Sequence, residues 1–152
     1  MKRIVSALLV LAVFAALAVV VATSKHGVRA VYAQSGCSVA TLSGNYAFSQ
    51  SGFTPKKLNG NQLPAADVGV FAFDGTGNVS ASWTDVFAGV VTTNHTGSGT
   101  YTVNSDCTGS LSGTTGDLAG VTANMVIIGG GTEIFGINTI PSVTATIDIK
   151  KL

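Results

Sequence analysis

The chain has 152 residues, of which 46% are hydrophobic and 10% are charged, and its formal net charge at pH 7 is +1. Four of its eight basic residues lie in segment 1–33 and all seven acidic residues lie beyond it, so residues 34–152 carry a net charge of −3 and contain no arginine. Proteins that bind nucleic acids need clustered Lys and Arg, so this balance argues against a nucleic-acid partner.

The N-terminal segment has the organisation of a signal peptide. Lys2 and Arg3 precede an apolar run from Ile4 to Ala22, and small side chains at Val31 and Ala33 suit a signal peptidase. We expect cleavage after Ala33, which leaves residues 34–152 as one domain that is secreted, periplasmic or held at the cell surface. The apolar run of 19 residues is also long enough to span a bilayer. The alternative is therefore an uncleaved helical anchor, which would be the only membrane contact.

Beyond residue 33 the pattern is that of short strands and turns. Runs rich in Val, Ile, Thr, Phe and Tyr alternate with polar residues, and Gly, Asn, Asp and Ser separate them. For example, Val79, Ala81 and Trp83 share one face of a predicted strand. Candidate strands lie near 44–50, 67–74, 78–85, 87–94, 98–105, 108–114, 121–128, 133–139 and 143–150. Residues 52–66, with two prolines, are predicted to form the one long loop.

Eight or nine short strands joined mostly by short turns predict an all-β fold. One apolar and one polar face per strand indicates an antiparallel sheet over a single core. We expect a single up-and-down antiparallel barrel of about eight strands, because closure removes exposed edges. A β-sandwich is the alternative.

Two cysteines remain beyond the predicted cleavage site. Cys37 and Cys107 would reach an oxidising compartment, so we expect them to form a disulfide. The alternative is two separate buried thiols. Neither cysteine has a second ligand at zinc spacing, and we expect no metal and no other cofactor.

Residues 74–85 contain a partial calcium-loop pattern. Asp74, Thr76, Asn78, Ser80 and Asp85 occupy oxygen-ligand positions, but the sixth position is Val79 and the bidentate Glu is missing. A hairpin turn explains the same residues, and we favour that interpretation.

Two ionisable residues are candidates for chemistry. His95 is the only histidine beyond residue 33, and it lies in a polar, glycine-rich stretch that predicts an exposed turn. Glu133 is the only glutamate and shares a strand face with Phe135. If that face lined a barrel interior, burial would raise the pKa of Glu133, as an acid–base role requires. A solvated position at the rim is the favoured alternative.

An eight-stranded barrel has an interior that side chains just fill, or that holds one small ligand. If the interior is hollow, the residues predicted to line it are the apolar phase of four strands together with one acid: Phe71, Phe73, Trp83, Tyr101, Phe135 and Glu133.

The motif order Cys37-x4-Leu42-x-Gly44-x-Tyr46-x-Phe48, then DGTGN, then YTVNSDCTG, resembles a family of small secreted bacterial proteins without an assigned function. The resemblance covers nearly all of residues 34–152. It implies an exported all-β domain whose barrel is similar to those of allene oxide cyclase and the lipocalins. It implies no activity.

Three functional hypotheses follow. The first is a non-catalytic exported barrel that binds a small apolar ligand or a surface component. The second is a structural or interaction domain with a filled core. The third is a small enzyme of the cyclase type that uses Glu133. Only the first and third require a cavity.

Overall fold

The computed structural model describes residues 36–58 and 61–152. The predicted signal peptide, its cleavage site and the alternative anchor lie outside these residues. Within the described part of the chain, no helix is long and apolar enough to cross a membrane.

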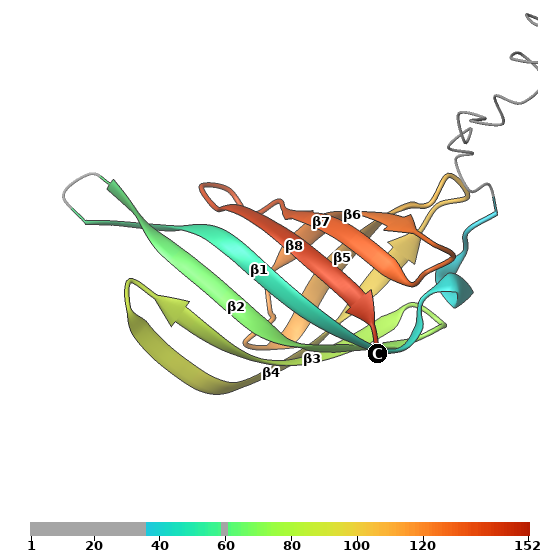
Figure 1. The fold of residues 1–152 in the computed structure, drawn as a ribbon, viewed down its shortest axis with the longest axis horizontal. Coiled ribbons are helices and arrows are strands. Elements are labelled where there is room, and N and C mark those ends of the chain that lie inside the picture. Colours follow the sequence, from blue (N-terminus) through green and yellow to red (C-terminus); the bar gives the residue numbers. More distant parts are fainter. Residues whose placement is uncertain (1–35, 59–60) are drawn as a thin grey trace, which may run out of the picture. The chain divides into compact units, whose positions relative to one another are not determined.

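The described residues form an all-β fold (Figure 1). A short 3-10 helix, η1 (Val39–Thr41), is followed by eight strands, which are β1 (Ser43–Leu58), β2 (Asn61–Asp74), β3 (Asn78–Phe87), β4 (Val90–Val103), β5 (Thr108–Gly116), β6 (Thr122–Ile128), β7 (Glu133–Asn138) and β8 (Thr144–Lys151). Each strand pairs antiparallel with the next, and β8 pairs with β1. The sheet is therefore a closed up-and-down barrel, as predicted, and the sandwich alternative is wrong.

Two of the predicted strand and loop assignments are wrong. The strands expected at 87–94 and 98–105 are one strand, β4, which continues through the glycine-rich stretch. The long loop expected at 52–66 is mostly a continuation of β1 and β2, which stay paired beyond Phe53 and Pro64. Cross-strand pairing overrides the local turn signal of Gly and Pro in both places, because the neighbouring strands supply backbone partners.

The barrel interior has a filled end and an end lined by small residues. At the filled end, Phe73 packs edge-to-face against both Tyr46 and Tyr101, with ring centroids 5.2 and 5.0 Å apart. At the opposite end, small residues occupy inward positions on five strands, namely Gly52, Ala65, Ala123, Gly136 and Ala145. The distribution of side-chain volume along the strands therefore leaves room at one end only.

The N-terminal residues close the filled end. The Tyr101 hydroxyl lies 2.9 Å from the carbonyl oxygens of both Val39 and Leu42, which holds η1 against the barrel. The predicted disulfide between Cys37 and Cys107 is confirmed, and it ties the residues before η1 to the β4–β5 turn. We refer to this end as the disulfide end and to the opposite one as the hairpin end, after the β1–β2 and β3–β4 hairpins.

The turn after β2 is a side-chain-supported hairpin turn. The Asp74 carboxylate accepts hydrogen bonds from the backbone N–H groups of Thr76 and Asn78, and from their side chains. These four donors lower the pKa of Asp74. The turn interpretation of the partial calcium pattern therefore accounts for the carboxylate oxygens, and the described residues contain no cluster of His, Cys, Asp or Glu suited to a metal ion.

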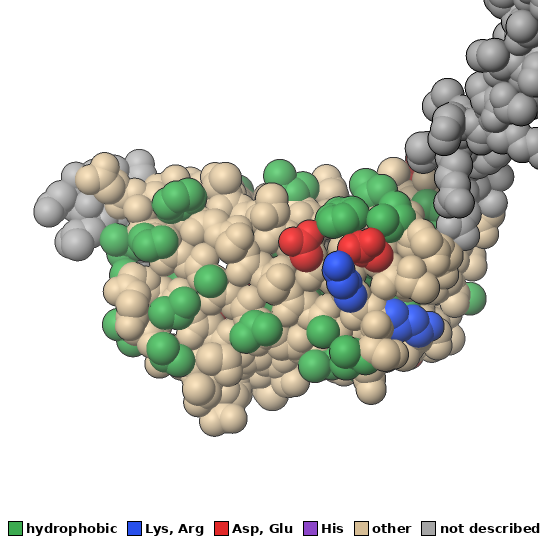
Figure 2. All heavy atoms as spheres, in the orientation of Figure 1, with side chains coloured by type: hydrophobic (Ala, Val, Ile, Leu, Met, Phe, Trp, Pro, Cys, Tyr) green, Lys and Arg blue, Asp and Glu red, His purple; other side chains and the backbone are tan. Residues whose placement is uncertain are grey.

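The outer surface mixes small polar, apolar and a few charged side chains. In Figure 2 acidic and basic side chains lie next to one another, and apolar ones are scattered among uncharged ones. On the neighbouring strands β7 and β8, the Oε1 atom of Glu133 and the Nζ atom of Lys150 are 3.2 Å apart.

Candidate functional site

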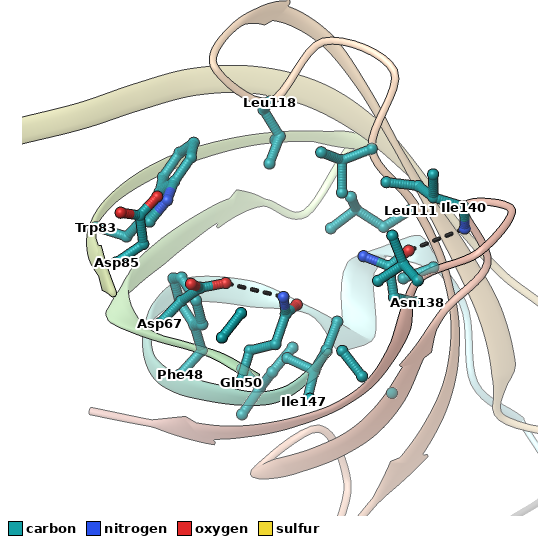
Figure 3. Close-up of a pocket in the computed structure, with 18 of the residues that line it drawn as sticks. Phe48, Gln50, Asp67, Trp83, Asp85, Leu111, Leu118, Asn138, Ile140 and Ile147 are labelled. Carbon is teal, nitrogen blue, oxygen red and sulfur yellow. Dashed lines mark hydrogen bonds between the residues drawn. The ribbon is translucent and has the colours of Figure 1, made fainter. Parts of the chain in front are cut away.

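The hairpin end of the barrel contains a cavity of about 390 Å³ (Figure 3). Its deep walls are apolar and include Phe48, Phe71, Leu111, Met125 and Ile147. Leu118, in the β5–β6 turn, points into it. Phe53 and Phe87, which are 48% and 43% exposed, also line it, which places the cavity mouth beside the two hairpins.

One wall of the cavity is polar. Gln50 pairs directly with Asp67 across β1 and β2, and Asp67 pairs directly with Asp85 across β2 and β3. Directly opposed residues in an antiparallel pair point to the same face, so all three side chains face the interior. Gln50 Nε2 donates a hydrogen bond of 2.8 Å to Asp67 Oδ2. The register thus places two carboxyl groups side by side in the wall.

A bulge in β4 brings a histidine to the same wall. The β3–β4 hairpin pairs Asp85 with Thr92, but Trp83 then pairs with His95 and not with Asn94. The extra residue is accommodated by Asn94, which has a φ of +65°. The bulge shifts the phase of β4 by one residue, so His95 faces the interior where Asn94 would otherwise do so. The expectation of an exposed turn at His95 is wrong for this reason.

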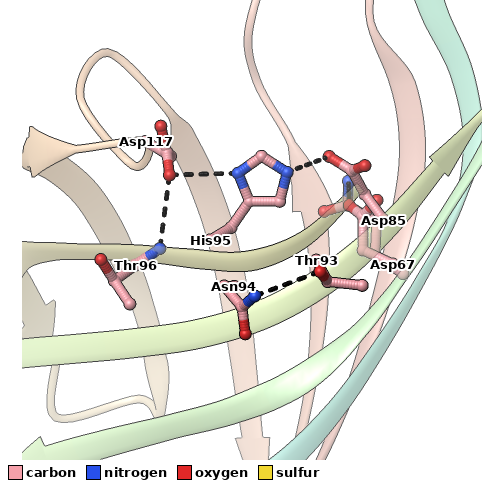
Figure 4. Close-up of polar contacts among 8 residues, drawn as sticks. Asp67, Asp85, Thr93, Asn94, His95, Thr96 and Asp117 are labelled. Carbon is pink, nitrogen blue, oxygen red and sulfur yellow. Dashed lines mark hydrogen bonds and ion pairs between the residues drawn. The ribbon is translucent and has the colours of Figure 1, made fainter. Parts of the chain in front are cut away.

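His95 lies between two carboxylates (Figure 4). Its Nδ1 is 3.1 Å from Asp117 Oδ2, and its Nε2 is 3.1 Å from Asp85 Oδ2. The second contact lacks the alignment of a hydrogen bond. The ring also stacks on Trp83, with centroids 5.2 Å apart.

The carboxyl groups of this wall differ in their electrostatic surroundings. Burial and repulsion by Asp85 raise the pKa of Asp67 to about 6, although attraction to His95 opposes the shift. Hydrogen bonds from the His95 ring and the Thr96 N–H lower the pKa of Asp117. Asp67 therefore exchanges its proton close to neutral pH, as a group that binds or transfers protons must. We call Gln50, Asp67, Asp85, His95 and Asp117 the polar belt.

The predicted ligand-binding residues fall into three groups. Phe71 and Trp83 line the cavity, and the predicted inward face of Val79, Ala81 and Trp83 is confirmed. Phe73 and Tyr101 are inward and buried, but they pack in the filled disulfide end and do not line the cavity.

Phe135 and Glu133 lie on the outer surface, so the interior position predicted for Phe135 is wrong, and Glu133 has the solvated position that was favoured over its place in the interior. Phe135 is 47% exposed, and Glu133 pairs with Lys150. The inward residues of β7 are Ile134, Gly136 and Asn138. Apolar residues occur in both phases of β7, so its alternation does not indicate which face is inside.

The acids of the polar belt were missing from the predicted site. The sequence nevertheless indicates two of these acids. Asp67 alternates in step with the apolar residues Phe71 and Phe73, and Asp85 alternates in step with Ala81 and Trp83. An acid in the apolar phase of a strand is a buried-carboxylate candidate. No comparable signal exists for Asp117 or His95, because a turn and a bulge position them.

Comparisons with known proteins supply no relative, since no family model, no curated protein and no solved structure matches this chain. The resemblance to small secreted bacterial proteins therefore stays a prediction.

Proposed function

We propose that this protein is an exported β-barrel that binds a small, mainly apolar molecule in the cavity at the hairpin end. The observation that carries the proposal is the cavity itself. Its volume of about 390 Å³ falls within the range of small-molecule sites, and apolar walls with a few grouped polar side chains are their usual composition.

The residues around the cavity favour binding over a filled structural core. Ala65 and Ala145 stand at inward positions where larger side chains would fill the barrel, as Tyr46, Phe73 and Tyr101 do at the disulfide end. The 3-10 helix and disulfide stabilise that filled end. A rigid closed end with an open opposite end is an arrangement suited to a cup-shaped binding site.

Export is part of the same proposal. It rests on the signal-like segment 1–33 and on the disulfide, which agrees with an oxidising extracellular or periplasmic location. A carrier or receptor outside the cell is the role that we infer.

The proposal is tested by titration with Nile red, a neutral dye whose emission rises in apolar surroundings. We expect saturable binding of one dye per barrel. Ala65→Phe places a large side chain in the cavity and should weaken binding at least tenfold. Ala66→Phe is the matched control, since the neighbouring Ala66 is exposed on the outer face. Equal affinities for the two variants, or no saturable binding to the wild type, would leave the structural hypothesis.

A catalytic function is the second candidate, and one observation favours it. Asp67, with a pKa of about 6, lies in an apolar cavity whose wall also holds His95, which is the composition of an acid–base site. Glu133, the acid first considered for a cyclase-type enzyme, lies outside the cavity. Mass spectrometry of a bound ligand before and after incubation distinguishes the two functions, because a carrier returns its ligand unchanged.

A further inference from the structure

Two buried carboxylate oxygens in the polar belt have no hydrogen-bond donor. The side chain of Asp85 is only 7% exposed, and its Oδ1 accepts from no group among the described residues. The buried Oδ1 of Asp67, on the neighbouring strand, likewise has no donor there. Both residues line the cavity. A buried acceptor without a donor costs free energy, so a ligand gains an advantage when these carboxylates rotate to turn the oxygens toward donors that it brings into the cavity.

The net charge of the polar belt indicates which kind of hydrogen-bond donor a ligand would bring to it. The belt contains one imidazole and three carboxyl groups, those of Asp67, Asp85 and Asp117, and no Lys or Arg is among the described cavity-lining residues. Asp117 faces the Nδ1 side of His95, which leaves Asp67 without a basic partner of its own. A positively charged donor would therefore offset the excess of negative charge in surroundings that screen it weakly.

The other residues that line the cavity indicate the chemical character of the rest of the ligand. The Trp83 ring lines the cavity next to the acids, and the His95 ring stacks on one of its faces. Leu111, Met125 and Ile147 provide a hydrocarbon surface deeper in the cavity. The site thus combines an anionic wall with an apolar chamber.

We propose that Asp67 and Asp85 form a headgroup subsite for a protonated amine whose hydrocarbon part occupies the apolar chamber. This inference rests on the proposed function, since it assigns the chemical class of the ligand in the same cavity. An ammonium group has three donors and no acceptor, which matches two unpartnered carboxylate oxygens.

The test compares three ligands of one chain length, octylamine, 1-octanol and octanoate, at pH 7.5. Trp83 is the only tryptophan of the chain and lines the cavity, so its fluorescence reports binding directly. We expect octylamine to bind at least tenfold more tightly than octanol, and octanoate to bind most weakly. Equal affinities for octylamine and octanol would overturn the amine subsite and leave the proposed function standing. No saturable binding of any of the three would overturn both.

Variants locate the subsite. Asp67→Asn and Asp85→Asn should each reduce the preference for octylamine over octanol at least fivefold, with little change for octanol. Asp148→Asn removes an exposed acid from β8 and is the matched control, which should keep the full preference. If the control loses the preference to the same extent as the cavity variants, long-range charge accounts for it and the subsite is wrong.

A pH titration of the wild type provides a readout that does not depend on the variants folding. The polar groups that act on Asp67 are Gln50 from β1, Asp85 from β3 and His95 from β4, and Asp117 from the β5–β6 turn contacts the other side of the His95 ring. Protonation of Asp67 removes a negative charge, so octylamine affinity should fall at least threefold from pH 7.5 to pH 5, whereas octanol affinity should stay constant. A parallel fall for both ligands would contradict the proposal.

Discussion

At the residue scale, Asp67 is a group whose pKa differs between the folded and the unfolded chain. In the folded barrel, burial and the neighbouring Asp85 raise its pKa to about 6, whereas an unfolded Asp titrates near pH 4. Between these pH values the folded state holds the proton and the unfolded state has released it. Asp67 therefore stabilises the fold below about pH 4, and this contribution is lost as the pH rises through 6.

Replacing Asp67 by Asn should remove this pH dependence. The amide keeps an oxygen that can accept from Gln50 but cannot ionise, so Asp67→Asn should melt close to wild type at pH 4 and higher than wild type at pH 7.5. Thermal unfolding followed by circular dichroism at the two pH values measures the difference. A melting-temperature difference that does not change with pH would show that Asp67 titrates normally in the barrel.

At the element scale, the bulge in β4 positions the site, and Asn94 makes the bulge. Its φ of +65° lies in the left-handed region, which Asn and Gly tolerate and β-branched residues do not. Since Asn94 is exposed, a substitution there tests backbone conformation with little change in packing.

Asn94→Val should therefore destabilise the protein by roughly 1–2 kcal/mol, the usual cost of a left-handed conformation for a bulky residue. Asn94→Gly is the matched variant and should retain wild-type stability within a few tenths of a kcal/mol. Urea denaturation measures both. We also expect the Val variant to lose the Trp83–His95 stacking, seen as a change in tryptophan emission. Equal urea midpoints for Val and Gly would mean that the bulge is not strained.

At the scale of the whole molecule, the disulfide connects the residues before η1 to the β4–β5 turn, in the middle of the chain. Cys37 and Cys107 are separated by 70 positions, and closing a loop of this length should stabilise the protein by about 4 kcal/mol in the chain-entropy model. Adding a reductant should therefore lower the denaturant midpoint of the wild type. A Cys37→Ala/Cys107→Ala double variant is the control, and its lower midpoint should not respond to the reductant. A wild-type midpoint that ignores a reductant able to reduce the bond would contradict this account.

The proposal that the protein is exported predicts the N-terminus and the intact mass of the mature chain. Protein recovered from the oxidising compartment of an expression host should begin near Gln34, and its intact mass should include one disulfide. Retention of residues 1–33 in that mass would replace the signal peptide with the membrane anchor.

The sequence by itself determined the all-β class, the barrel of about eight strands, the disulfide and the inward face of Trp83. These features depend on alternation along single strands, on the turn at Asp74, and on there being two cysteines beyond the predicted cleavage site, all of which are readable locally. The tertiary structure alone decided which side chains meet in the cavity. Asp67 faces Asp85 through cross-strand register, and a bulge turns His95 inward, while the same closure leaves Phe135 outside. Register is a relation between strands that are distant in the chain, and a shift of one residue reverses every face, so no single strand carries that information.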